Sequence, residues 1–284
     1  MDTPRLRTVD AFTDRAFGGN PAGVVLLERP PSPDWMAELA AELGYSATAF
    51  VIAEELPDAD YRLRWFTPAV EIAICGHATL AAAHCLFSDG VALPVRFATR
   101  SGVLTVSAVG DGSLQMDFPA CPPSAVPAPD GLAEALGGAQ PLWAGRGETD
   151  DLLVELADAR TVRELQPDLA AVARLGGRSL LVTAAADGAA DGGADHDFVS
   201  RLFAPLIGIP EDPVTGSAHT VLGPYWAAKL GRNELTGRQL SARAGVVGIR
   251  VAADRVLLTG RAVTVLQGHL TAAAAPRDLA EQAG

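Results

Sequence analysis

Two segments of the chain place similar residue types at similar spacing, and both end in groups that can bind a small anion. The first runs from Phe66-Thr-Pro68 to Cys75-Gly-His77, and the second runs from Phe203-Ala-Pro205 to Thr215-Gly-Ser217. An apolar run follows each segment, so each is expected to enter a helix at its glycine. The first turn of a helix carries backbone N–H groups without intrahelical partners and the positive end of the helix dipole, which favour a bound carboxylate. Two such helix starts aimed at one cleft would form an active site for a small acid.

Alternating and helical hydrophobic patterns predict the elements that position these segments. In the first half we expect strands over 5–12, 23–27, 49–53, 61–66, 95–98, 102–109 and 113–118, with helices over 33–43 and 77–87. In the second half we expect helices over 131–136, 169–174 and 216–230, with strands over 152–156, 180–184, 199–203, 239–244, 246–251, 255–260 and 262–266. The proline-rich stretch 119–131 is predicted to cross between the halves, because proline lacks a ladder donor, and 185–196 is predicted to be a loop. The pattern alone indicates an α+β protein with two similar halves.

Three motifs resemble those of one known family. They are Gly19-Asn-Pro-Ala-Gly23, the run Phe66–Ala81 that contains Cys75-Gly-His-Ala-Thr79, and Glu211-Asp-Pro-Val-Thr-Gly-Ser-Ala218. Over residues 5 to about 265 the chain resembles the phenazine-biosynthesis PhzF-like isomerases, which are relatives of diaminopimelate epimerase. The resemblance implies an α+β fold of two pseudo-symmetric lobes, each a curled, mostly antiparallel, barrel-like sheet around a central helix. We expect an N-terminal lobe over 1–118, which a strand near 262–284 can rejoin, a C-terminal lobe over 119–261, and an active site between them.

The resemblance also assigns roles to side chains. His77, which by its position alone could be a packing or capping residue, matches the family's catalytic-site histidine. Asp212, which could instead cap the second helix, matches the family's Asp-Pro-x-Thr-Gly-Ser motif, and we expect it and Ser217 to act in catalysis. Glu71 and Glu211 are expected to be structural or solvated. The substrate-binding candidates offer backbone N–H, hydroxyl, amide or thiol groups: Gly76, Gly216, Ser46, Thr48, Asn20 and Cys75.

One position departs from the family pattern. Family members typically read Ser-Glu-Thr before the strand that follows the first helix, and that glutamate shuttles the proton, whereas this chain reads Ser46-Ala47-Thr48. A methyl group cannot act as a general acid or base. Three explanations stay open: the glutamate was exchanged to trap a substrate, proton transfer moved to another group, or the chain lost catalysis and kept binding. The candidate replacements are the side chains of Asp212, His77 and Cys75 and the substrate's own carboxylate.

We therefore predict a cofactor-independent isomerase that shifts a double bond by proton transfer in a small unsaturated carboxylate or cyclic amino acid, in secondary-metabolite biosynthesis. The alternative is a catalytically silent protein that binds small acids on the same scaffold. An epimerase with two thiol bases is disfavoured, because Cys75 lies at the first helix start but 212–217 contains no cysteine. The sequence contains no recognisable nucleotide fingerprint, metal-ligand cluster or cofactor lysine motif, so we expect neither cofactor nor metal.

Composition narrows the range of partners. The formal net charge of -12 disfavours nucleic acid, whose binding requires a basic surface. No apolar stretch approaches the roughly 20 residues of a membrane span, and the first ten residues lack the apolar core of a secretion signal, so we expect a cytoplasmic protein that does not bind membranes. The three cysteines have no metal-ligand spacing and are expected to be thiols. The family resemblance further implies a homodimer.

Overall fold

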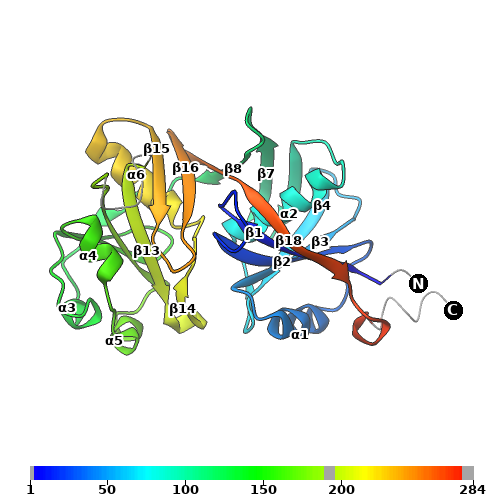
Figure 1. Ribbon diagram of the computed structural model, residues 1–284, viewed down its shortest axis with the longest axis horizontal. Helices are drawn as coiled ribbons and strands as arrows, with labels where there is room; N and C mark the ends of the chain where they lie inside the picture. Colours follow the sequence, from blue (N-terminus) through cyan, green and yellow to red (C-terminus); the bar gives the residue numbers. More distant parts are fainter. Residues whose placement is uncertain (1–2, 189–195, 277–284) are drawn as a thin grey trace. The chain divides into compact units, whose positions relative to one another are not determined.

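The computed structural model describes residues 3–188 and 196–276 and divides the chain into two compact units (Figure 1). Unit 1 comprises Met1–Asp117 and Gly260–Gly284, and unit 2 comprises Phe118–Thr259. Each unit is a curled mixed sheet with few helices, so the predicted α+β class with a curled sheet in each half is confirmed. In the described part of the chain no helix combines the length and apolar character that a membrane span requires.

The described residues of unit 1 form nine strands around one central helix. In their order across the sheet, eight of the strands are β18 (Ala262–His269), β1 (Arg5–Ala11), β2 (Asn20–Leu27), β3 (Ala47–Ile52), β4 (Tyr61–Phe66), β6 (Val95–Thr99), β7 (Gly102–Ala108) and β8 (Leu114–Pro119). The ninth, β5 (Glu71–Ile72), forms a hairpin on β4. The helices are α1 (Pro33–Leu43), α2 (Gly76–Ser88) and the short 3₁₀ helix η2 (Ala272–Ala274). Pairing of β18 with β1 returns the C-terminal strand to unit 1.

Unit 2 follows the same plan. Across its sheet lie β9 (Ser124–Ala125), β10 (Trp143–Arg146), β11 (Asp151–Glu155), β12 (Ser179–Ala185), β13 (Phe198–Ala204), β15 (Glu234–Gln239), β16 (Gly245–Ala252) and β17 (Arg255–Gly260). The strand β14 (Ile209–Asp212) forms a hairpin on β13. The helices are α3 (Leu132–Ala135), α4 (Ala159–Glu164), α5 (Leu169–Arg174), η1 (Pro205–Ile207) and α6 (His219–Leu230).

Strand pairing makes the two units equivalent residue by residue. In both units two neighbouring strands run parallel (β2 with β3, β11 with β12), an antiparallel strand with a short hairpin follows, and the next strand is again parallel. Thr48 lies opposite Phe66, and Leu180 lies opposite Phe203, so Thr48 and Leu180 occupy equivalent positions. The central helices α2 and α6 both follow the hairpin strand and precede the second parallel strand.

The same Arg–Glu pair clamps this hairpin in each unit. Arg64 on β4 donates through Nε and Nη2 to the two carboxylate oxygens of Glu71, at 2.8 and 2.9 Å. Arg201 on β13 makes the same fork to Glu211, at 2.7 and 3.0 Å. Bidentate pairs of this kind fix geometry as well as adding stability. Both glutamates therefore have the structural role that the sequence indicated.

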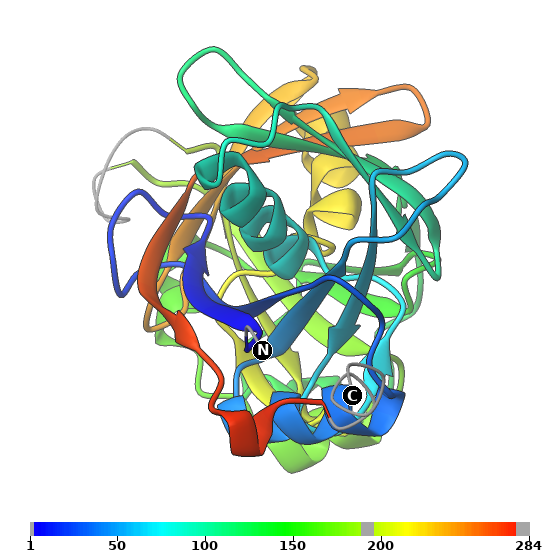
Figure 2. The same ribbon diagram turned by 90° about the vertical axis from the view of Figure 1, so that its right-hand side faces the viewer.

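The central helix of unit 1 is almost entirely buried. Apart from His84, Phe87 and Ser88, every residue of α2 is buried, which agrees with the absence of a polar face in its sequence. Figure 2 shows α2 beside the strands β1, β2 and β18. On the other face of the sheet α1 packs through Met36 and Ala40 against Phe50. Its ends follow ordinary capping chemistry, because Ser32 Oγ accepts from the third residue of the helix and Gly44 adopts a left-handed conformation.

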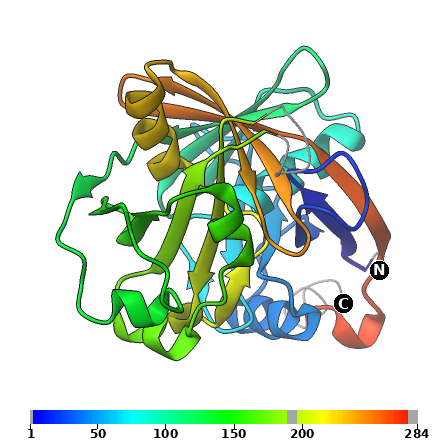
Figure 3. The same ribbon diagram turned by 60° about the vertical axis from the view of Figure 1, so that its left-hand side comes forward.

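The central helix of unit 2 contains a proline whose cost is offset locally. Pro224 has no N–H to donate to the carbonyl of Thr220, and that carbonyl accepts instead from the backbone N–H of Cys121, at 3.0 Å. The bond joins α6 to the stretch that leads into unit 2. Short helices α4 and α5 pack beside β13 at the edge of this unit, as Figure 3 shows.

Several predicted elements differ from those observed. The strand expected over 239–244 ends at Gln239, because its amide binds Asp212 and Ala244 turns with a positive φ. The crossover contains one short strand, β9, which pairs with β10. The strand β10 and the helix α4 were not predicted, because each is too short for a clear period. Residues 189–195 of the expected loop lie outside the described residues.

A buried histidine supports the start of α6. The Nδ1 of His219 lies 2.8 Å from the carbonyl oxygen of Thr215, and a carbonyl can only accept, so Nδ1 carries the proton. Its Nε2 is buried without a hydrogen-bond partner among the described residues. A Cβ on Gly237 would lie 3.1 Å from this nitrogen, so the glycine makes room for the ring. Complete burial lowers the pKa of His219 from 6.5 to about 4, against the opposing effect of the bond to Thr215.

Because of this low pKa, the protein becomes less stable as the pH falls. Between pH 6.5 and about pH 4 the unfolded state binds a proton at His219 that the folded state excludes, so the free energy of unfolding should decrease as pH falls through this window. We expect the contribution to be about 1 to 3 kcal/mol. Urea unfolding at pH 7 and pH 4.5 measures it, with His219→Asn as the comparison, because an amide can still donate to Thr215 but does not titrate. Equal pH dependence of the two proteins would contradict the assignment.

Candidate functional site

In unit 1 the structure joins four of the expected site residues in one chain of contacts. Ser46 Oγ donates to Asn20 Oδ1 at 3.0 Å and lies 3.2 Å from His77 Nε2. On the other side of the ring, Cys75 Sγ lies 3.6 Å from His77 Nδ1. Cys75 is the N-cap of α2 but makes no side-chain capping bond, so its thiol is directed to the imidazole instead. The β2 start, the β3 start and the α2 start each supply part of this set.

The contacts fix a consistent direction for the protons. The hydroxyl of Ser46 uses its only hydrogen toward Asn20, so the Nε2–H of His77 must donate to Ser46 Oγ. That neutral tautomer leaves a lone pair on Nδ1, which faces the thiol of Cys75. A thiol beside an imidazole acceptor and a helix N-terminus can transfer its proton to the ring. The unit 1 set can therefore act as an acid–base pair.

Ala47 and Thr48 point to opposite faces of β3. Thr48 shares its face with Phe50, which packs on α1, because alternate residues of a strand face the same way. Its hydroxyl is buried and has no hydrogen-bond partner among the described residues. Ala47 lies on the other face and is fully buried. Ser46 lies in the bend before β3, outside the alternating strand, and contacts His77, whereas Thr48 lies on the face of the strand that packs toward α1.

In unit 2 the loop from β14 to α6 is held by its own side chains. Thr215 Oγ1 donates to Asp212 Oδ2 at 2.5 Å, and both residues are buried. Gln239 fixes the backbone of the same loop, because its amide nitrogen donates to the Asp212 carbonyl at 2.6 Å and its oxygen accepts from the Thr215 N–H at 2.8 Å. The carboxylate of Asp212 is thus placed by the loop rather than by capping α6, since the helix begins seven residues later at His219.

The second helix start is tighter than predicted. Residues 216–218 form turns instead of α-helix, and the N–H of His219 bonds to the carbonyl of Gly216 in a 3₁₀ pattern. Bonds between residues three apart are common in the first turn of a helix, and they shift its formal start from Gly216 to His219. Among the described residues the backbone N–H groups of Gly216 and Ser217 have no hydrogen-bond partner. They can donate to an anion.

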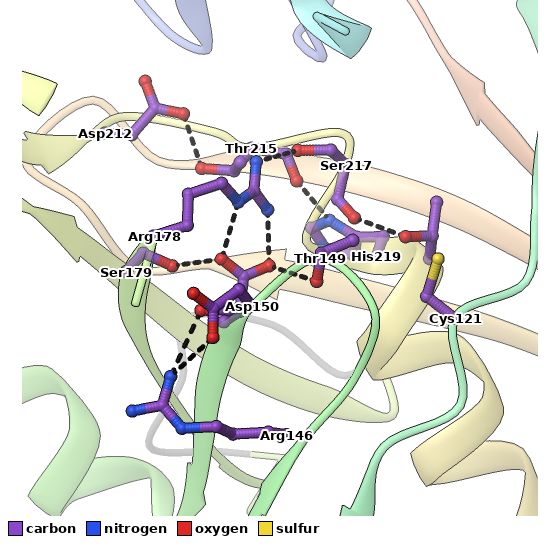
Figure 4. Close-up of polar contacts among 12 residues, drawn as sticks. Cys121, Arg146, Thr149, Asp150, Arg178, Ser179, Asp212, Thr215, Ser217 and His219 are labelled. Atoms are coloured by element: carbon purple, nitrogen blue, oxygen red, sulfur yellow. Dashed lines mark hydrogen bonds and ion pairs between the residues drawn. The ribbon is translucent and has the colours of Figure 1, made fainter. Parts of the chain in front are cut away.

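A charged residue missed by the sequence analysis also belongs to this half-site. Arg178 Nη1 donates to Ser217 Oγ at 3.1 Å (Figure 4). The rest of its guanidinium binds the buried carboxylate of Asp151. The Gly176-Gly177 turn that precedes it adopts positive φ at both glycines, and Arg146 packs across Gly177. An arginine after a glycine pair was the available signal, but it has no match in the family motifs quoted above.

Each half-site is defined within its own unit. The expected active site between the lobes, with Ala47, His77, Asp212, Gly216 and Ser217 lining one cleft, stays a prediction. Of the remaining thiols, Cys85 is buried in α2, and burial raises its pKa to about 11. No group of three or more His, Cys, Asp or Glu side chains in residues 3–188 and 196–276 is placed to hold a metal ion.

Comparison with known proteins agrees with this architecture. The family model described as phenazine biosynthesis-like protein, PhzC-PhzF, matches residues 9–268. A Pseudomonas aeruginosa protein described as an uncharacterized isomerase is 47% identical over 92% of this chain and 96% of its own length. An uncharacterized isomerase of Halalkalibacterium halodurans is 42% identical over 95% and 99%. The crystal structure of a PhzF family protein from Enterococcus faecalis covers 95% of this chain and 99% of its own, at 37% identity and a TM-score of 0.86. The chain therefore belongs to the PhzF-like isomerase family.

Proposed function

We propose that this isomerase moves a double bond by proton transfer in a small unsaturated carboxylate or cyclic amino acid. The observation that carries the proposal is the repeated helix start, which presents Gly76-His77 in one unit and Gly216-Ser217 in the other, each with its side chain held by hydrogen bonds. Donors fixed in advance at a site of developing charge stabilise an enolate-like intermediate. Both half-sites serve one substrate in this proposal.

The chemistry is a proton transfer that needs no redox step. A base removes a proton from a saturated carbon next to a double bond, the electron pair is delocalised over the double bonds and the carboxylate, and the proton returns to a different carbon. The N–H groups of Gly216 and Ser217 stabilise the negative charge that develops on the carboxylate. No atom is gained or lost and no electrons leave the substrate, so the proposed reaction needs no redox partner, and we propose that groups of the chain alone carry it.

Two groups are proposed to move the proton in place of the family's glutamate. In unit 1 the imidazole of His77 takes the proton of the Cys75 thiol, because Sγ and Nδ1 are already in contact, and the resulting thiolate is the base that removes the substrate proton. In unit 2 the carboxylate of Asp212 is the second acid–base group, aligned by the hydroxyl of Thr215. Ser46 and Asn20 keep His77 in the tautomer that accepts from the thiol.

We further propose a cytoplasmic role in secondary-metabolite biosynthesis, with no nucleic-acid or membrane partner, on the basis of the acidic composition and the family resemblance. A homodimer is expected by the same resemblance. Light scattering of the purified protein at micromolar concentration measures the mass, and a monomer mass at all concentrations would exclude the dimer.

The function is tested by exchange of solvent deuterium into carbon positions of small acids, followed by mass spectrometry or NMR. A panel of cyclohexa-1,4-diene-1-carboxylate, Δ1-pyrroline-2-carboxylate and methylitaconate covers ring and open-chain acids. His77→Gln and Asp212→Asn should each lower the exchange rate by about 10²- to 10⁴-fold, the usual contribution of general acid–base catalysis. Their melting temperatures should change much less. A large loss of stability at Asp212→Asn with unchanged exchange would assign that residue to the loop alone.

Ala47→Glu separates the remaining explanations. If the alanine replaced a catalytic glutamate in a chain with no other base, Ala47→Glu should raise exchange by about 10²- to 10⁴-fold, while Ala47→Gln, of nearly equal size, should not. If Cys75 and Asp212 have taken over, the alanine protein exchanges protons already and Ala47→Glu slows it. If neither protein exchanges an acid that both bind, the chain is a silent binding protein.

A further inference from the structure

Arg178 and Ser46 occupy equivalent positions in the two units. Because Thr48 and Leu180 are equivalent in strand register, the residues two positions earlier in each unit are equivalent as well. Ser46 contacts the side chain that follows Gly76, and Arg178 contacts the side chain that follows Gly216. Each unit therefore uses the same backbone position to hold the side chain at its helix start, with a hydroxyl in one unit and a guanidinium in the other.

Arg178 is itself held firmly. Asp151 is fully buried and binds two nitrogens of the guanidinium, Nε at 2.8 Å and Nη2 more closely. The same carboxylate accepts from Ser179 Oγ at 2.6 Å and from Thr149 Oγ1 at 2.8 Å. Four donors on one buried carboxylate fix both its position and that of the arginine. The third nitrogen, Nη1, reaches Ser217.

This bond determines what the hydroxyl of Ser217 can do. A guanidinium only donates, so Ser217 Oγ must accept from Arg178 and keeps its own hydrogen. Among the described residues no other side chain or backbone group bonds to this oxygen. The hydrogen of the hydroxyl is therefore available to an acceptor that is not part of the chain, and the neighbouring guanidinium charge strengthens it as a donor.

We propose that Arg178 is a positioning residue that fixes Ser217 as a hydrogen-bond donor and gives this half-site its preference for a carboxylate over a neutral group. The inference rests on the proposed function in one respect, that Ser217 contacts the substrate. It goes beyond it by assigning the specificity for the anion to an ion pair between β11 and the residue that precedes β12.

A purely structural role for Arg178 makes a different prediction. An ion pair that only joins the two strands would stabilise unit 2 without regard to Ser217. Removing it would then change the acid affinity equally in the unaltered protein and in Ser217→Ala. A double-mutant cycle separates the two roles, because it measures the coupling between the side chains instead of the effect of either one alone.

The probes are 2-aminobenzoate and its neutral isostere 2-aminobenzamide, with affinities measured by calorimetry on the full chain. Arg178→Gln should lower the affinity for the acid by about 10- to 100-fold, as expected for loss of a charge-assisted hydrogen bond, and leave that for the amide within about twofold. In the Ser217→Ala background the same substitution should change the acid affinity by less than about threefold. Arg178→Lys, which keeps the charge, should recover part of the loss. Arg174→Gln removes an exposed ion pair in the same unit and should have no effect.

Equal losses in both backgrounds would overturn the proposal, as would an unchanged preference for the acid in Arg178→Gln. Urea unfolding of each variant identifies any that lost its fold, and Arg178→Lys then replaces Arg178→Gln in the cycle. If Ser217→Ala alone leaves the acid affinity intact, the proposed role of Ser217 in the substrate site fails. That result is distinguishable, because it does not depend on the arginine.

Discussion

The site depends on one constraint, which is that each central helix packs against a curled sheet and buries its first turn there, so neighbouring strands hold the side chains at the helix start. In both units the chain enters this helix from a short hairpin, and the Arg64–Glu71 and Arg201–Glu211 forks hold that hairpin to the sheet. The forks place the strand end, and the strand end sets where the helix begins. A side chain at the first turn is then directed by whatever lies at the start of the neighbouring strand, Ser46 or Arg178.

Burial explains why so few polar groups are used. Desolvation penalises any charged or hydrogen-bonding group that lacks a partner. The polar residues around the two helix starts are accordingly arranged in short chains in which each donor has an acceptor, as from Ser46 to Asn20 or from Thr215 to Asp212. Among the described residues of the turn that precedes α6, the N–H groups of Gly216 and Ser217 and the hydroxyl hydrogen of Ser217 are left to bind a ligand.

Sequence patterns predicted the repeated halves and most long elements, including α1 and β4 to the residue. Period and capping residues are local properties, so they can be read without the fold. The motifs also identified Asn20, Ser46, Cys75 and His77, which the structure joins. What the sequence could not show was Arg178, because its partner lies 39 residues away and its equivalence to Ser46 exists only in the strand register. Short strands such as β10 were not predicted for a related reason, because they form only by pairing with strands distant in sequence.

The equivalent positions in the two halves carry side chains of opposite chemical character. In unit 1 the helix start has a thiol in contact with an imidazole, and its support from Ser46 and Asn20 is uncharged. In unit 2 the helix start has a hydroxyl backed by a guanidinium, which never gives up its proton. A symmetric pair of bases would suit inversion of one carbon. Under the proposed function the two units differ, with a thiol and an imidazole in unit 1 and the carboxylate of Asp212 beside an anion-holding turn in unit 2, and such an unequal pair suits transfer of a proton between different carbons of one carboxylate. The divergence of side chains on a repeated backbone thus favours isomerisation over epimerisation.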